Sequence, residues 1–304
     1  MRNMSWLDRQ SFLGANSEQR LAEMTVGLVG LGGGNSHVVQ QLAHAGVGNF
    51  VLMDMDHISL TNLNRLIGGT WWYVLKRTAK VAIMKRMILA INPKARIETH
   101  PKQWQLAGDV LKRCDVIVGG LDNVRGKDEL DAFCRRFLIP YIDQGMDVHK
   151  LDRGHGHLVA GQVVLSEPGS PCLRCMGIVT DEALAEESRK YGAAGGRPQV
   201  VWSNGVLASL AVGLVVQMVA PWSRRARPGA YLSYDGNSGL VTEAERFRRW
   251  NAASCSHYPH TAVGDPSFDI RKFVAADVSA KHAPLGWRDW IIRSVRSWTN
   301  ALFL

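Results

Sequence analysis

A chain of 304 residues, 46% of them hydrophobic, is long enough for one large α/β domain or two smaller ones with a packed core. The net charge of +9 suits anionic ligands such as nucleotides or an acidic protein. There is no basic low-complexity tail, so a nucleic acid partner is not expected. Five cysteines, an odd number, argue against a disulfide framework, and the N-terminus shows no apolar signal-peptide region, so we expect a cytoplasmic protein.

One or two short helices are expected across residues 6–22, ahead of a stretch with a glycine cluster. An apolar run at Val26–Val29 leads into the glycines, a helix with one buried face follows, and a second apolar run ends at Met53. The glycines and the acids that follow the second run are Gly30, Gly32, Gly33, Gly34, Asp54 and Asp56. This order predicts a nucleotide-binding βαβ unit, in which the helix N-terminus attracts phosphate and the acid accepts hydrogen bonds from ribose.

Strands and helices continue to alternate after this unit. A helix is predicted from about residue 78 to 90, and strands are predicted at 96–99, 115–120 and 139–143. The pattern indicates a Rossmann-like, doubly wound and mainly parallel sheet. Lys80 opens the predicted helix, where a cation opposes the helix dipole, so we expect an anion as its partner; the alternative is an exposed lysine.

The second half of the chain predicts antiparallel additions to the sheet. A strand is expected at 162–165 and a hairpin at 231–234 and 240–242. Residues 200–220 are long and apolar enough for a membrane span, but polar residues interrupt them, and we favour a buried helix. Residues 284–304 form an amphipathic pattern rich in tryptophan and arginine, for which we favour docking on protein over a membrane surface.

The residues after the second strand resemble the ThiF/MoeB/HesA family, relatives of the ubiquitin-activating enzymes. Members carry a G-x-G-G-x-G-S turn, then D-x-D, then S-N-L-x-R. The matching positions are Gly30, Gly32, Gly33, Ser36, Asp54, Asp56, Asn62, Leu63 and Arg65. Asn35 replaces the third glycine and Thr61 replaces the serine. We expect the helix to approach the strand slightly differently at Asn35 and the nucleotide site to be retained.

The resemblance covers roughly residues 7–260 and implies ATP-dependent adenylation of a protein C-terminus. The partner would be a ubiquitin-like or sulfur-carrier protein ending in Gly-Gly, whose carboxylate attacks the α-phosphate. Asp54 would hold ribose, Asp122 would work with Mg²⁺, and Arg9 would reach the ATP of the second subunit in a homodimer. The residues implied for nucleotide binding are Gly30, Gly32, Gly33, Asp54, Asp56, Asn62, Arg65, Lys80 and Asp122. Helix capping is the alternative role for Asp122.

A second motif of the family is a structural zinc knuckle. Cys172 and Cys175 form a C-x-x-C in a P-C-x-x-C loop, which resembles its first half. The second half is altered, and Cys255 with His257 or His260 would complete a Cys₃His site, which Zn²⁺ accepts. A redox pair or an emptied knuckle is the alternative. No cysteine lies between Cys175 and Cys255, so we expect adenylation without a stable enzyme thioester.

These motifs divide the chain into an adenylation domain, residues 1–260, and a C-terminal extension, 261–304. The domain comprises a nucleotide-binding half, 1–150, and a zinc and crossover half, 151–260. Three other functions remain open. The protein would then be a nicotinamide-dependent oxidoreductase, a non-catalytic scaffold subunit of a heterodimeric activator, or an enzyme that acts on a modified tRNA base, as one subgroup of this superfamily does.

Overall fold

The computed structural model describes residues 5–151, 156–189, 198–223, 229–251, 255–258 and 270. The chain divides into two units, Met1–Ile270 and Arg271–Leu304. The helix expected at residues 284–304 and the alternative zinc ligand His260 lie outside the described residues. The fold below is that of the first unit.

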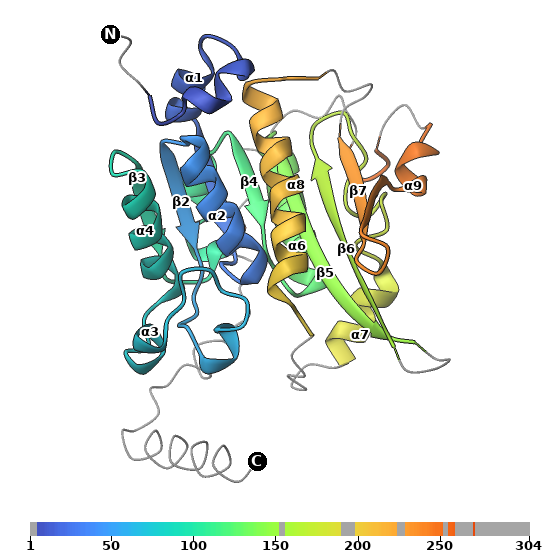
Figure 1. The fold of residues 1–304 in the computed structure, drawn as a ribbon. Helices are drawn as coiled ribbons and strands as arrows, with labels where there is room; N and C mark the ends of the chain where they lie inside the picture. The colour runs from blue at the N-terminus through green and yellow to red at the C-terminus, as the bar shows by residue number, and fades with distance from the viewer. Residues whose placement is uncertain are drawn as a thin grey trace. The chain divides into compact units, whose positions relative to one another are not determined.

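Eight strands form one sheet in the order β3-β2-β1-β4-β5-β6-β7-β8 (Figure 1). The strands are β1 (Thr25–Val29), β2 (Asn49–Met53), β3 (Arg96–His100), β4 (Val116–Gly119), β5 (Tyr141–Lys150), β6 (His157–Ser166), β7 (Ala230–Asp235) and β8 (Leu240–Glu243). The five from β3 to β5 pair in parallel, and β6, β7 and β8 add antiparallel. The predicted Rossmann-like sheet with antiparallel additions is therefore confirmed.

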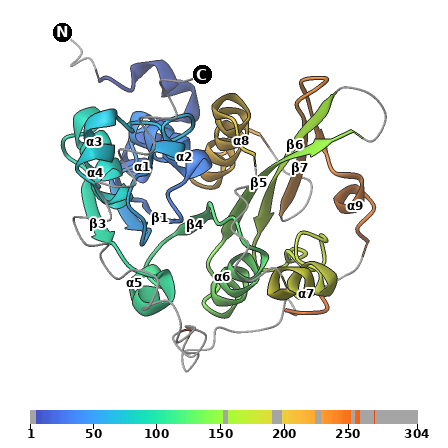
Figure 2. The same ribbon diagram turned by 90° about the horizontal axis from the view of Figure 1, so that it is seen from below.

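Helices cover both faces of this sheet (Figure 2). One face carries α2 (Gly33–Ala45), α4 (Lys80–Ile91) and α8 (Val201–Val219), and the other carries α5 (Gly108–Leu111), α6 (Val124–Arg136) and α7 (Asp181–Arg189). The shorter helices are η1 (Asp8–Leu13), α1 (Ser17–Glu23), η2 (Leu60–Asn62), α3 (Trp71–Leu75), η3 (Trp104–Ala107) and α9 (Glu245–Arg248). In doubly wound sheets, ligands bind at the carboxyl ends of the parallel strands.

Two hydrophobic clusters lie on opposite faces of the sheet. Val26 and Leu28 of β1 belong to the cluster with α2, α4 and α8, while Val29 belongs to the cluster with α5 and α6. Because the central strands are buried on both faces, they are apolar at nearly every position. This explains why the central strands were predictable from the sequence.

Helix α8 packs against α2, β5 and β6 through buried residues such as Leu207, Ala211 and Val215. Among the described residues, it is the one helix that is long and apolar enough to cross a membrane, by length and composition only. Its contacts match the buried helix expected from the sequence.

Several short helices were not predicted, among them α3 and α7. In α3, the Thr70 side chain accepts a hydrogen bond from the Tyr73 backbone N–H and so starts the helix. The segment that contains α7 is polar, and the position of this helix depends on its contacts with α6. Both helices are too short to be stable alone and depend on tertiary contacts.

Candidate functional site

The glycine turn lies between β1 and α2, at the carboxyl end of the sheet. Gly30 has a φ of +78°, and a Cβ there would lie 2.9 Å from the Gly120 carbonyl oxygen, so only glycine fits. Gly32 is the N-cap of α2, and an added Cβ would meet nothing within 4 Å. The first turn of α2 therefore offers backbone N–H groups beside open space, which suits an anion.

Asp54 ties the end of β2 to this turn. Its two carboxylate oxygens accept hydrogen bonds from the backbone N–H groups of Leu31, at 2.6 Å, and Asp56, at 2.7 Å. Burial raises the pKa of Asp54, and the nearby Lys80 ammonium opposes that rise. Asp54 therefore has a structural role in addition to any contact with ribose.

Lys80 is buried rather than exposed, with 10% of its side chain accessible. Its Nζ lies 2.8 Å from Asp56 Oδ2 and 3.8 Å from Asp54 Oδ2. The anion partner expected for a lysine at a helix N-terminus is thus present within the chain. The two acids and the lysine meet at the ends of β2 and α4.

Asn62 and Arg65 belong to the loop that covers the turn. Asn62 Oδ1 accepts the backbone N–H of Ser59 at 3.0 Å and so shapes this loop. Arg65 reaches across to the turn, because a Cβ on Gly33 would lie 3.2 Å from Arg65 Cγ and Cδ. The aliphatic part of Arg65 therefore packs against the start of α2, and its Nη1 donates to the Thr61 carbonyl and, at 3.1 Å, to Asn64 Oδ1.

Asn35 fills the space that the third glycine of the motif leaves open. Its Nδ2 lies 2.8 Å from the Gly30 carbonyl, 3.1 Å from the Val118 carbonyl and 3.3 Å from the Val29 carbonyl. Gln144 Nε2 donates to Asn35 Oδ1 at 2.6 Å. The substitution therefore joins β1, β4 and β5 through a buried amide, which is a larger change than the altered approach we expected.

The end of β4 carries Asp122, whose side chain is exposed beside the start of α6. The N-cap of α6 is Asn123, which accepts the backbone N–H of Gly126, so capping by Asp122 is wrong. Glu187 of α7 accepts hydrogen bonds from the backbone N–H groups of Val124 and Arg125, both at 2.9 Å. Asp122 is thus left available at the carboxyl end of the sheet.

Lys127 and Arg9 are two further residues whose positions bear on the family pattern. Lys127, at the position of a family arginine, donates to Asp143 Oδ2 at 2.7 Å and is buried. Arg9 is exposed in η1, and its neighbour Gln10 donates to the Ala45 carbonyl at the far end of α2. Because α2 spans about 20 Å at 1.5 Å per residue, Arg9 is remote from the glycine turn of its own chain.

The cysteine and histidine expected to bind zinc form one cluster. Ligand atoms of Cys172, Cys175, Cys255 and His257 all lie within 4.8 Å of one another. Cys175 Sγ lies 3.5 Å from Cys255 Sγ and 3.3 Å from His257 Nδ1, and Cys172 Sγ lies 3.5 Å from His257 Nδ1. A tetrahedral zinc ion places two thiolates about 3.8 Å apart, so this donor set and its spacing fit Zn²⁺.

Cys172 and Cys255 shift the pKa of each other in opposite directions. A hydrogen bond with Cys172 lowers the pKa of Cys255 to about 4, and the Tyr258 backbone N–H, 3.3 Å from the Cys255 sulfur, acts in the same direction. The same hydrogen bond, with burial, raises the pKa of Cys172. Burial raises the pKa of Cys114 to about 12 and also raises that of Cys134, so both behave as small buried apolar residues.

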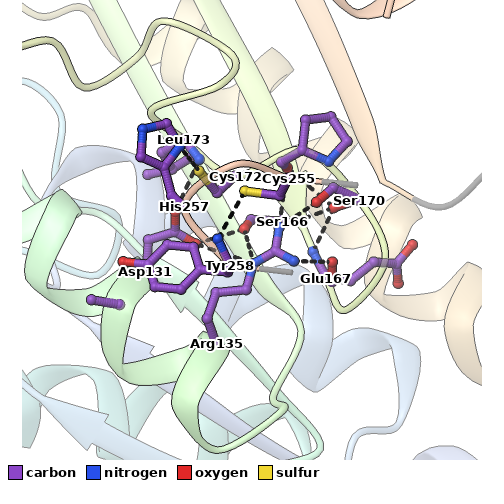
Figure 3. A network of polar contacts seen from close by, with 12 residues as sticks. Asp131, Arg135, Ser166, Glu167, Ser170, Cys172, Leu173, Cys255, His257 and Tyr258 are labelled. Atoms are coloured by element: carbon purple, nitrogen blue, oxygen red, sulfur yellow. Dashed lines mark hydrogen bonds and ion pairs between the residues drawn. The ribbon is translucent and has the colours of Figure 1, made fainter. Parts of the chain in front are cut away.

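A buried polar network connects this cluster to α6 (Figure 3). Asp131 accepts hydrogen bonds from the Leu173 backbone at 2.9 Å and from Ser166 Oγ at 2.6 Å. Arg135 Nε donates to Ser166 Oγ at 3.0 Å, and its Nη2 donates to the Pro171 carbonyl at 3.1 Å. The loop that carries the first two cysteines is therefore fixed to the helix that begins beside Asp122.

The fold and these two sites define an α/β protein with a nucleotide-type glycine turn and a Cys₃His cluster. The model of the ThiF family matches residues 7–256, and the chain belongs to this family. The glycine cluster is therefore the turn of this family and not the dinucleotide-binding fingerprint of an oxidoreductase.

Relatives of this chain have several names. It is 26% identical over 245 residues to the molybdopterin-synthase adenylyltransferase of Escherichia coli, covering 79% of this chain and 90% of the relative. It is 32% identical over 133 residues to the tRNA threonylcarbamoyladenosine dehydratase of Haemophilus influenzae, covering 43% of this chain and 50% of that protein. The chain thus spans about half the length of this and several other curated relatives that it matches.

Solved structures support the fold. The crystal structure of E. coli MccB with ATP has a TM-score of 0.65 and 21% identity, and the match covers 84% of this chain and 75% of that one. At this identity the likeness concerns the fold alone.

Proposed function

We propose that this protein is an adenylyltransferase that activates the C-terminal carboxylate of a ubiquitin-like or sulfur-carrier protein with ATP. The carboxylate attacks the α-phosphate, an acyl-adenylate forms and pyrophosphate leaves. The observation that carries this proposal is the approach of Arg65 to Gly33 at the N-terminus of α2. The relatives named adenylyltransferases are consistent with it.

Each residue has a distinct part in this proposal. Asp54 holds ribose, and the glycine turn with Arg65 and Lys80 holds the phosphates. Such a reaction needs alignment of two anions and neutralisation of charge rather than a covalent group of the enzyme. The Lys80 ammonium, now paired with Asp56, exchanges one carboxylate partner for phosphate oxygens when ATP binds.

Two metals belong to the proposal. Asp122 would hold Mg²⁺, which bridges phosphate oxygens and offsets their charge, and the exposure of its carboxylate at the end of β4 fits that role. The Cys₃His cluster would hold Zn²⁺ and stabilise the knuckle. Because Cys255 belongs to this cluster, no enzyme thioester is included.

Arg9 gives a reason to include a homodimer. Its position at the far end of α2 leaves its own glycine turn out of reach, so contact with ATP requires a second copy of the chain. An Arg9→Ala variant that adenylates normally would remove this part of the proposal.

A scaffold subunit without activity is disfavoured because Arg65, Lys80 and Asp122 are all retained.

A second candidate is a tRNA substrate. Two relatives named tRNA threonylcarbamoyladenosine dehydratase are 32% and 33% identical over 133 and 136 residues, and the net charge of +9 suits a nucleic acid. The Cys₃His cluster favours the protein substrate, because a zinc knuckle is typical of the protein-activating members.

The experiment is ATP–pyrophosphate exchange with ubiquitin-fold proteins ending in Gly-Gly and, in parallel, with tRNA. We expect exchange that needs the protein and is lost in Asp122→Ala. Asp115→Ala is the matched control, because this carboxylate lies just before the other end of β4. Exchange that needs tRNA alone would replace the first candidate with the second, and ATP binding without exchange would favour a scaffold.

A further inference from the structure

Four buried side-chain atoms in the described part of the chain have no hydrogen-bond partner, and they share one region. They are His37 Nε2, Gln144 Oε1, Ser203 Oγ and Asn204 Nδ2. A buried polar atom without a partner costs about 1–3 kcal/mol, and native proteins rarely leave one. These four atoms at the junction of α2, β5 and α8 are groups that a bound molecule would satisfy.

Two contacts place two of these atoms, those of Asn204 and Gln144, beside the glycine turn. Asn204 Nδ2 lies 2.5 Å from where a Cβ on Gly33 would be, and Gln144 Oε1 lies 3.0 Å from the same position on Gly34. Gly33 and Gly34 are the first two residues of α2. The two amides therefore lie against the helix turn that would bind phosphate.

The orientation of the Gln144 amide is fixed by its neighbour. Asn35 Nδ2 faces three carbonyl oxygens, so Asn35 Oδ1 must face Gln144. Oδ1 accepts from Gln144 Nε2, and this leaves Gln144 Oε1 as an acceptor without a donor. Asn204 Nδ2 is the reverse, a donor without an acceptor.

This mixture of groups separates two kinds of ligand. A phosphate of ATP has only acceptor oxygens and cannot satisfy Gln144 Oε1. The terminal residue of a peptide has both a carboxylate, which accepts, and a backbone N–H, which donates. The pair of amides therefore matches the end of a peptide and not a nucleotide phosphate.

We propose that Asn204 and Gln144 bind the last residue of the acyl substrate. Asn204 Nδ2 donates to an oxygen of the reacting carboxylate, and Gln144 Oε1 accepts the backbone N–H of the same residue. This assignment rests on the proposed adenylation of a protein C-terminus and names the chemistry that the site selects, an α-amido carboxylate. Both residues are positioning residues, because they fix the carboxylate beside the α-phosphate.

The sheet order agrees with this assignment. Asp54 follows β2 and Gln144 belongs to β5, and these two strands lie on opposite sides of β1 in the order β2-β1-β4-β5. The ribose and the acyl tail would thus approach the glycine turn from opposite sides. An attack on the α-phosphate between them needs that separation.

The first test is Asn204→Leu, which removes the unpartnered donor and keeps the size of the side chain. We expect higher thermal stability, because a buried orphan group is lost and leucine is the better helix former. We also expect the KM for a ubiquitin-fold protein ending in Gly-Gly to rise roughly 3- to 10-fold, the value of one neutral hydrogen bond, while the KM for ATP stays constant. Ser209→Ala, on the exposed side of α8, is the control.

Other outcomes of this test overturn the assignment. An unchanged KM for the protein means that ordered water satisfies the amides, and a raised KM for ATP alone means that Asn204 binds phosphate. If leucine disrupts packing, Asn204→Ala carries the same test. Wild-type protein that forms no adenylate refutes the proposed function as well, whereas normal turnover by both variants refutes this assignment alone.

The second test concerns Gln144. The same protein substrate is made with an ester in place of its last peptide bond, which removes the N–H that Gln144 would accept. We expect the ester to lower kcat/KM roughly 3- to 10-fold in the wild type and to have no effect in Gln144→Met. Within each protein, kcat/KM for the amide substrate is divided by kcat/KM for the ester substrate. This ratio cancels any loss of activity that comes from the altered contact with Asn35. An equal penalty in both proteins would overturn the role of Gln144.

Discussion

Asn35 provides a direct test of how this site is stabilised, because the family motif has glycine there. Restoring that glycine in Asn35→Gly removes a donor that faces the carbonyls of Val29, Gly30 and Val118. It also leaves Gln144 Nε2 without its acceptor. Two net hydrogen bonds are worth about 2 kcal/mol, and the orphaned amide adds about 1–3 kcal/mol. We therefore expect the free energy of unfolding to fall by about 3–5 kcal/mol.

The assay for this change is urea unfolding, followed by circular dichroism, with the midpoint and slope compared between variants. Gln40→Gly on the same helix is the matched control. It should lower the free energy of unfolding only through the poor helix propensity of glycine, by about 1 kcal/mol or less. A loss in Asn35→Gly no larger than that of the control would refute the reasoning, since it would mean that the buried amide contributes nothing. A gain in stability would contradict it more strongly.

Three further predictions concern separate parts of the molecule. Lys80→Met should weaken ATP binding at least tenfold by calorimetry without unfolding the protein, and unchanged affinity would remove the lysine from the phosphate site. Wild-type protein should contain one zinc ion per chain by elemental analysis, and Cys255→Ser should lose most of it; equal zinc in both would exclude this thiolate as a ligand. Glu187→Gln should speed hydrogen exchange at the Val124 and Arg125 amides, because an amide has only one acceptor oxygen for the two N–H groups that the carboxylate now binds; unaltered exchange would show that α7 does not protect the start of α6.

The sequence predicted the parts of the fold that have a strong local pattern. The runs Val26–Val29 and Phe50–Met53 are apolar throughout because both faces of the central sheet are covered, and they formed β1 and β2 nearly as expected. The clustering of Cys255 and His257 with the C-x-x-C pair was likewise accessible, because few residue types bind zinc.

Other features were hidden because they depend on tertiary contacts. Nothing in the pattern around Asn204 or Glu187 indicates that the first lies against the glycine turn and the second covers the start of α6. Lys127 was compared with a family arginine, but its burial and its pairing with Asp143 depend on the position of β5. The one available signal was Asn204 itself, a polar residue in an apolar helix, which we interpreted only as an argument against a membrane span.

The central claim is that a carboxylate attacks the α-phosphate of ATP, and oxygen labelling tests it most directly. A ubiquitin-fold protein ending in Gly-Gly, with ¹⁸O in its C-terminal carboxylate, is incubated with the enzyme, ATP and a nucleophile that releases the acyl group. The account predicts one ¹⁸O atom in the AMP that is formed, and none in pyrophosphate. Unlabelled AMP, or ADP with the label in inorganic phosphate, would contradict the account.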